Sequence, residues 1–213
     1  MGNVQLKRVE SVKYLGVILD ENVTWSEQTE HLCKRLSCSA GIFSKLRYYI
    51  DTKTMIEMYH ALFNSKLQYA ILCWGSASAT QISKLQVLQN KAIRNMNKAP
   101  RFYRLDNYYL NQRILKVADL FELEVSKFMH SHFHNSLPLC FSSFFVESRY
   151  LHSYPTRHAE QRNYNVSMFR TNRGKRSIQF LGPTIWNNTP NEIRSLSKTS
   201  FKNKMKSSIL SRY

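Results

Sequence analysis

The chain has 213 residues, is 43% hydrophobic and contains only six glycines and five prolines, which excludes a low-complexity or disordered chain. Its 31 lysines and arginines outnumber 14 acidic residues, and a net charge of +17 favours a polyanionic partner such as nucleic acid over a merely basic soluble surface. No apolar run approaches the ~20 residues of a membrane span, and no signal-peptide pattern is present, so we expect an intracellular location, in nucleus or cytoplasm, and no membrane partner.

The first predicted elements are a strand and a helix. Residues 12–20 are rich in β-branched and aromatic side chains, which predicts a strand, and Gly16 within it indicates a bulge. From Ser26 to about Arg47, apolar residues recur at spacings of three and four, the pattern of a helix with one buried face. The chain therefore opens with a strand followed by a long amphipathic helix.

Two further helices follow. Thr54 and Glu57 have the spacing of a capping box, and the helix that they begin should end at a left-handed Gly75. A third helix is predicted over residues 80–99, where apolar and basic side chains occupy opposite faces, and a loop over residues 100–110. These helices predict a helical bundle.

The C-terminal part is expected to be less regular. A fourth helix is predicted over residues 111–135, followed by an irregular basic stretch over 148–176. Residues 178–181 are a candidate for a short strand, with a turn at Gly182-Pro183, and residues 197–212 have the pattern of a last helix. The sequence thus predicts a mainly α fold with a basic extension at its C-terminal end.

No local pattern predicts a catalytic site. Two-metal nucleotidyl transfer needs carboxylates that bridge both ions, and the only adjacent acids, Asp20 and Glu21, belong to a predicted solvated turn. No phosphate-binding glycine loop and no nucleophile elbow is present. We therefore predict no catalytic residue, no metal ligand and no cofactor in this chain.

The histidines and cysteines also receive structural interpretations. His130 and His134 share one helix face and could bind a metal, but no third ligand completes a site, so a solvated helix C-terminus is the preferred interpretation. The four cysteines contain no C-x-x-C pair, and three of them fall on apolar helical stretches, where a free thiol acts as a small buried hydrophobe.

The basic C-terminal segment favours contact with nucleic acid. Glu160 and Glu192 are the only acids after residue 150, so this segment holds more than half of the excess positive charge. Four basic residues cluster around Gly174, with aromatic residues interleaved: Arg170, Arg173, Lys175 and Arg176, with Tyr154, Tyr164 and Phe169. Cations neutralise phosphates and aromatic faces stack on unpaired bases. The alternative is a flexible basic face with no specific ligand.

Six short motifs follow one another along the chain. They are Val12–Asp20 with Thr24-Trp25, Gly41–Arg47, Tyr69 with Trp74-Gly75, Leu88–Arg94, Tyr154–Arg157, and Ser177–Pro190. Each motif alone is weak, but their common order resembles that in reverse transcriptases of jockey- and CR1-like non-LTR retrotransposons. Two positions depart from the family pattern, because Ala70 replaces a usual glycine and Thr189 a usual leucine.

The resemblance implies a role for each part of the chain. Tyr14, Leu15, Gly16 and Val17 would form the primer grip at the edge of the polymerase palm, and the next helices would form the thumb along the template–primer. The family's catalytic aspartates would lie N-terminal to Tyr14, so we expect this chain alone to be inactive as a polymerase. Mg²⁺ is then expected only in the complete enzyme, with the missing finger–palm portion as a further partner.

Basic residues on the thumb helices and in the C-terminal segment are the candidates for phosphate contacts. They are Lys34, Lys45, Arg47, Lys84, Lys91, Arg94, Arg157, Arg170, Arg173, Lys175 and Arg176. The expected ligand is an RNA or DNA template–primer, bound by its backbone. For any one of these side chains taken singly, a solvated surface position is the preferred interpretation.

We therefore interpret the chain as a fragment of an RNA-directed DNA polymerase of a transposable element. Four parts are predicted: a palm-edge hairpin over residues 1–24, a helical thumb over 25–100, a connecting loop and helix over 101–147, and a basic extension with a short strand and a terminal helix over 148–213. Three alternatives remain open. The chain could complete a polymerase together with another polypeptide, dock a protein through the helix over residues 111–135, or be a relic without function.

Overall fold

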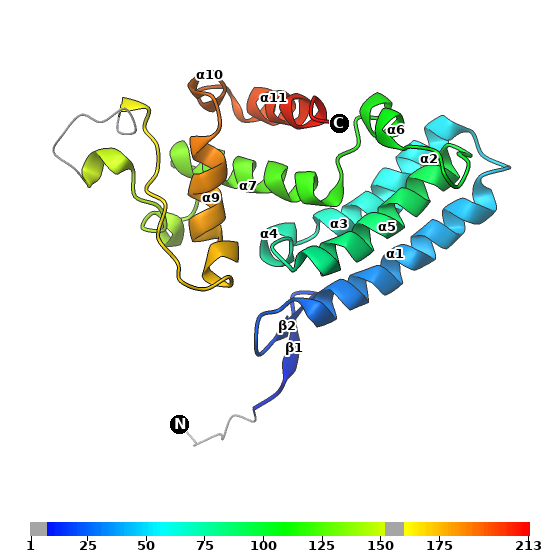
Figure 1. Cartoon of the computed structure of the whole chain (residues 1–213), viewed down its shortest axis with the longest axis horizontal. Helices are drawn as coiled ribbons and strands as arrows, with labels where there is room; N and C mark the ends of the chain where they lie inside the picture. The colour runs from blue at the N-terminus through cyan, green and yellow to red at the C-terminus, as the bar shows by residue number, and fades with distance from the viewer. Residues whose placement is uncertain (1–7, 152–159) are drawn as a thin grey trace. The chain divides into compact units, whose positions relative to one another are not determined.

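The computed structural model describes residues 8–151 and 160–213 of the chain. The chain divides into two compact units, an N-terminal unit that ends at Leu105 and a C-terminal unit that begins at Asp106. The described residues are mainly helical, with one two-stranded antiparallel sheet near the N-terminus, which confirms the predicted mainly α fold (Figure 1). None of the helices in these ranges has the length and apolar composition needed to cross a bilayer.

The N-terminal unit consists of a hairpin and a group of helices. In chain order its elements are β1 (Ser11–Tyr14), β2 (Val17–Asp20), α1 (Ser26–Leu46), α2 (Thr52–Tyr59), the π-helical η1 (His60–Asn64), α3 (Ser65–Gln68), α4 (Ile71–Trp74) and α5 (Ala79–Met96). Helices α1 and α5 are the long ones and pack against each other along their length (Figure 1). The predicted first and third helices are thereby confirmed.

The segment predicted as one strand is a hairpin. Tyr14 pairs with Val17 across a two-residue turn, and both turn residues have positive φ, 46° at Leu15 and 79° at Gly16. Positive φ at both central positions suits the right-handed twist of paired strands. Gly16 therefore lies in a turn and not in a bulge. The sequence did not indicate this turn, because the apolar pattern continues through it. The hairpin that the family resemblance implied is confirmed.

The second predicted helix is interrupted, and its caps differ from the prediction. Asp51, not Thr54, caps it, since the Asp51 carboxylate accepts the backbone N–H of Thr54 at 3.1 Å. The chain passes through η1 and breaks at Ala70, whose φ is 51°. Gly75 has φ −65° and is not left-handed. The left-handed position is thus Ala70, in a conformation that glycine adopts more readily than alanine.

The C-terminal unit is built around α7. Its elements are α6 (Asp106–Asn111), α7 (Val117–Phe133), the short 3-10 turns η2 (Leu139–Phe141), η3 (Ser148–Tyr150) and η4 (Gly174–Arg176), and the helices α9 (Ile178–Asn187), α10 (Asn191–Arg194) and α11 (Lys198–Leu210). Both α9 and α11 pack on α7 (Figure 1). The terminal helix is confirmed. The predicted loop over residues 100–110 is partly helical, and the predicted fourth helix begins later, at Val117.

The predicted short strand and turn are wrong, because residues 178–181 and Gly182-Pro183 belong to α9. A β-carbon on Gly182 would lie 2.6 Å from the Met129 sulfur of α7, so the glycine allows close helix packing and does not form a turn. A short segment such as Ile178-Gln179-Phe180-Leu181, with three apolar residues out of four, fits a strand or a helix equally well. The structure shows a helix here, and Trp186 on the same helix is fully buried in the core of the C-terminal unit.

The cysteine prediction is also wrong. Cys38, Cys73 and Cys140 are exposed, and only Cys33 is partly buried, with all four thiols free. Cys38 lies on the side of α1 opposite the core residue Leu36. A cysteine within an apolar helix is therefore not necessarily buried.

Candidate nucleic-acid interface

Helix α1 carries two of the candidate lysines on its solvent face. Its buried stripe contains Leu36 and Phe43, and at 100° per residue Lys34 and Lys45 lie on the opposite side, where both are exposed. Arg47, just after the helix, is only partly exposed. The lysines are therefore placed to meet a ligand from solvent, whereas Arg47 is partly engaged with the protein.

Helix α5 carries a second basic face. Lys84 and Lys91 are exposed seven residues apart, two helical turns, and Arg94 lies three residues further on and is partly buried. The buried Arg94 Nε has no hydrogen-bond partner in the described ranges. No Asp or Glu occurs between Glu57 and Asp106 in the sequence. The positive charges on α5 are therefore not neutralised by any acidic residue of the segment between Glu57 and Asp106.

The basic residues of the hairpin, α1 and α5 act on one another. Partial burial and then the positive charges of Lys13 on β1 and of two basic neighbours on α1 lower the pKa of His31. The charge of Lys84 acts on Cys33 of α1, although burial raises the pKa of this thiol overall. These pairs connect α1 electrostatically with β1 and with α5. Basic side chains of these three elements therefore lie close enough to act on common groups, and Glu30 acts on Cys33 with the opposite sign.

The hairpin turn presents most of the residues assigned to a primer grip. Tyr14, Leu15 and Gly16 are exposed, and the Tyr69 hydroxyl donates to the Leu15 carbonyl, which fixes the turn. Val17 differs, because its side chain is buried. Three of the four residues are thus accessible to a ligand, whereas the buried Val17 side chain belongs to the core.

The basic residues around Gly174 lie in the C-terminal unit. Arg170, Arg173, Lys175 and Arg176 are exposed on the turn that precedes α9. The turn is ordered by Phe169, which packs against Gly174 so closely that a β-carbon there would lie 2.6 Å from the ring. The structure thus distributes the candidates over both units. Arg157, together with the rest of the Tyr154–Arg157 motif, lies outside the described residues.

The interpretation of His130 as part of a solvated helix end is wrong. His130 is 5% exposed, and its Nε2–H donates to the Leu196 carbonyl at 2.9 Å. His134 is exposed, but its Nε2 bonds the Arg194 carbonyl at 3.0 Å. Within residues 8–151 and 160–213, no group of three potential ligands could hold a metal ion. The two histidines therefore connect the C-terminal end of α7 with the last residue of α10 and with Leu196 just after it.

The burial of His130 predicts a loss of stability in acid. Burial lowers the pKa of His130 in the folded unit. In the unfolded chain a histidine has a pKa of about 6.5, so the unfolded chain binds a proton at a higher pH than the folded unit does. The free energy of unfolding of the C-terminal unit should therefore fall as the pH drops below about 6.5. Denaturant unfolding between neutral and mildly acidic pH measures this effect, and His130→Gln should reduce the pH dependence. An equal pH dependence in both proteins would contradict it.

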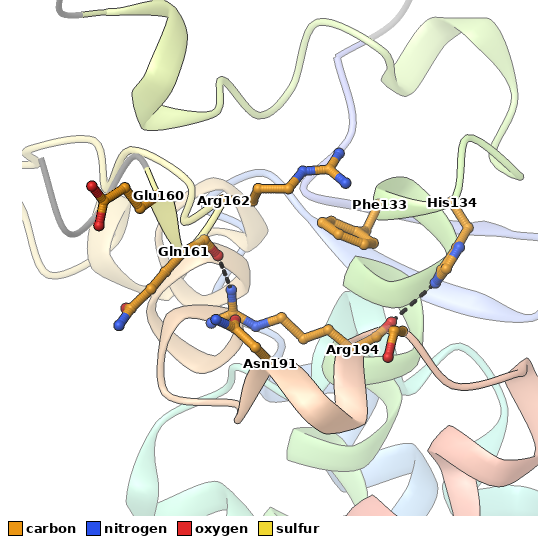
Figure 2. A pocket seen from close by; sticks show the side chains of 8 residues that line it. Phe133, His134, Glu160, Gln161, Arg162, Asn191 and Arg194 are labelled. Carbon is orange, nitrogen blue, oxygen red and sulfur yellow. Dashed lines mark hydrogen bonds between the residues drawn. The ribbon is translucent and has the colours of Figure 1, made fainter. Parts of the chain in front are cut away.

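Sequence patterns gave no indication of Arg194, a buried cation of the C-terminal unit. Arg194 is 4% exposed, and its guanidinium donates to four backbone carbonyls. The acceptors are Gln161 at 2.8 Å, Thr189 and Trp186 at 2.9 Å, and Asn187 at 3.2 Å. Figure 2 shows Arg194 reaching Gln161 beside a pocket of about 400 Å³. All acceptors are backbone atoms, so no side-chain spacing reveals the site.

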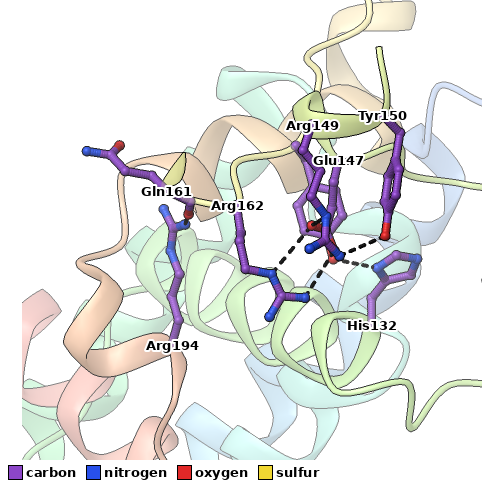
Figure 3. Close-up of polar contacts among 8 residues, drawn as sticks. His132, Glu147, Arg149, Tyr150, Gln161, Arg162 and Arg194 are labelled. Atoms are coloured by element: carbon purple, nitrogen blue, oxygen red, sulfur yellow. Dashed lines mark hydrogen bonds and ion pairs between the residues drawn. The ribbon is translucent and has the colours of Figure 1, made fainter. Parts of the chain in front are cut away.

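The other arginine of this pocket is also engaged. Arg162 lies with its guanidinium carbon 4.4 Å from the Phe133 ring centre and bonds Glu147 at 3.3 Å. Glu147 pairs with Arg149 as well, at 2.8 Å, and Figure 3 shows both arginines converging on it. The pocket cations therefore stabilise the fold, and the phosphate-binding candidates remain those of α1, α5 and the turn around Gly174.

Comparisons with known proteins agree with the family resemblance. The chain is 27% identical over 128 residues to the RNA-directed DNA polymerase from mobile element jockey of Drosophila funebris. It is 22% identical over 127 residues to the jockey polymerase of Drosophila melanogaster, and 27% over 137 residues to the probable RNA-directed DNA polymerase from transposon X-element of the same species. No protein-family model and no solved structure matches.

These matches cover 58–63% of this chain but only 14% of each relative. The chain thus corresponds to a small part of the curated proteins it matches. Over the matched region, the chain is a homologue of the RNA-directed DNA polymerases of non-LTR retrotransposons.

Proposed function

We propose that the N-terminal unit binds template–primer nucleic acid by its phosphate backbone, as the thumb of a reverse transcriptase. The observation that carries this proposal is the set of exposed cations on two packed helices: Lys34, Lys45, Lys84 and Lys91. None of them forms an ion pair with another described residue. Cations that are not neutralised by the protein release counterions from nucleic acid when they bind phosphates.

The chemistry of these contacts sets the character of the binding. Lysine offers a mobile point charge and does not read base edges, so binding should be independent of sequence and sensitive to salt. The exposed turn at Tyr14 and Leu15 would support the primer strand beside this surface. We propose that Mg²⁺ and the catalytic carboxylates belong to the finger–palm portion of the polymerase, which this chain would assist. The basic turn around Gly174 would add phosphate contacts from the C-terminal unit.

The alternative of a protein-docking helix receives less support. The apolar stripe of α7, which includes Val125 and Met129, is buried within its own unit, where α9 and α11 pack on it. A helix with its apolar stripe already covered has no free face of the kind that docks into a partner's groove. Nucleic-acid binding therefore remains the function that the described residues support best.

Lysine footprinting with a blunt DNA duplex tests the proposal. Exposed amines are acetylated with and without the duplex, and mass spectrometry measures the modified fraction at each lysine. We expect the duplex to protect Lys34, Lys84 and Lys91, because their ammonium groups would contact phosphates. Lys53 on α2 is equally exposed and serves as the internal control, since it lies outside both faces. Protection at Lys53 equal to that at Lys84, or no protection of the α1 and α5 lysines, would contradict the proposal.

A further inference from the structure

Two arginine–aromatic pairs with exposed rings lie just after α1 and α5. The Arg47 guanidinium carbon lies 4.6 Å from the ring centre of Tyr48, and Arg101 lies 5.8 Å from that of Phe102. The Arg47 Nη2 also donates to the Tyr48 hydroxyl at 2.6 Å. Tyr48 is 70% exposed and Phe102 is 93% exposed. Large aromatic faces open to solvent beside cations are the elements of a base-stacking platform.

Both pairs lie at the same end of the N-terminal unit. Helices α1 and α5 run parallel, because Gln81 bonds Ser26 near the start of each helix, and Asn95 Nδ2 donates to the Ala40 carbonyl, 3.2 Å away, towards their ends. Figure 1 shows the two helices ending on the same side of the unit. The pairs therefore lie beyond the C-terminal ends of the two helices that carry the proposed phosphate-binding faces.

The charge around this end favours an anionic ligand. Lys98, Arg101 and Arg104 follow α5 and are exposed, and neither Arg47 nor Arg101 forms an ion pair within the described ranges. The acid nearest to Tyr48 in the sequence is Asp51, and both of its carboxylate oxygens already accept hydrogen bonds from Thr54. A negatively charged ligand with a flat apolar face complements this surface.

We infer that this end of the N-terminal unit binds unpaired nucleotides, with bases stacked on Tyr48 and Phe102 and phosphates held by Arg47 and Arg101. Bases inside a duplex have both faces covered by their neighbours, so only an unpaired base offers a face to a protein ring. The inference rests on the proposed function, since the α1 and α5 faces would hold the adjoining duplex. A single-stranded extension of the template would then reach the exposed rings.

The C-terminal unit contains a matched pair for comparison. Arg149 lies 4.7 Å from the Tyr150 ring centre and donates to its hydroxyl at 2.7 Å, and Tyr150 is likewise 70% exposed. Arg149, however, is paired with Glu147 at 2.8 Å. This pair has the same geometry as Arg47 and Tyr48, but its charge is neutralised. Tyr150→Ala therefore controls for the loss of an exposed stacked tyrosine.

The test compares the affinity of the full chain for a blunt DNA duplex and for the same duplex with a single-stranded extension. We expect the extension to tighten binding about tenfold, the scale of one or two stacked bases. Tyr48→Ala with Phe102→Ala should abolish this gain without changing the affinity for the blunt duplex. Tryptophan at both positions should keep the gain, and Tyr150→Ala should leave it unchanged.

The outcomes separate this inference from the proposed function. Tight binding of the blunt duplex with no gain from the extension would overturn the inference alone. A gain that the Tyr48→Ala, Phe102→Ala protein retains would also overturn it. Failure to bind either ligand would overturn the proposed function and the inference with it, and circular dichroism of each variant shows that the chain is folded in every comparison.

Discussion

Replacement of Arg194 by alanine should lower the free energy of unfolding of the C-terminal unit by about 3–5 kcal/mol. The guanidinium is buried and donates to carbonyls from two separate segments, one at Gln161 and one over Trp186 to Thr189. Without it, those carbonyls lose a charged donor in a site that water enters poorly, at a cost of roughly 1–3 kcal/mol for each group left unsatisfied. Its guanidinium carbon also lies 5.3 Å from the Trp186 ring centre, which alanine cannot replace.

Arg162→Ala is the control for this prediction. Arg162 is exposed and contacts an aromatic ring and Glu147, so its loss should cost no more than about 1 kcal/mol. Hydrogen exchange of peptides from residues 106–213 in increasing denaturant measures the stability of this unit separately from the other. Equal effects of the two replacements would show that Arg194 does not organise the unit.

The helices with a clear apolar stripe could be predicted from the sequence. Leu32, Leu36, Ala40 and Phe43 on α1 recur with helical spacing and are all buried. The same holds for Leu85, Ala92 and Met96 on α5. The spacing of apolar residues predicts burial directly when one face of a long helix is covered. Both helices, and the exposure of Lys34 on α1 and Lys84 on α5, therefore follow from the sequence.

Features that depend on distant contacts could not be predicted. Residues 178–181 are too few to show a helical period, and their helix depends on packing against the distant Met129 through Gly182. Ala70 adopts a left-handed conformation that its own side chain disfavours, so its position in the break follows from tertiary structure. Arg194 bonds main-chain atoms up to 33 residues away, which leaves no pattern in the sequence.

The candidate site was predictable only in part, for the same reason. The lysines of α1 and α5 follow from helical periodicity, but Arg47 and Arg94 have buried Nε atoms that the sequence does not indicate. The exposure of Tyr48 and Phe102 was equally hidden, because aromatic residues near helix ends are more often buried than solvated. Exposure of a single side chain outside a regular helix depends on which segments happen to pass over it.

Reversing the charge of Lys34, Lys84 and Lys91 to glutamate should cause the largest loss of function. Each lysine that contacts a phosphate contributes roughly 0.9 to the slope of log affinity against log salt concentration, so three contacts contribute about 2.7. The positions are exposed and lie away from the helix ends, so folding should change by no more than about 0.5 kcal/mol at each site. A triple reversal at Lys53, Lys198 and Lys202 has the same net charge and controls for long-range electrostatics.

The affinity of these proteins for a blunt DNA duplex across a salt series tests whether α1 and α5 bind phosphates. We expect the unaltered chain to bind at low salt with a steep salt dependence. The Lys34, Lys84 and Lys91 variant should bind more weakly and with a shallower slope than the charge-matched control. A flat salt response of the unaltered chain, or equal slopes for the two triple variants, would contradict a phosphate-binding surface on α1 and α5.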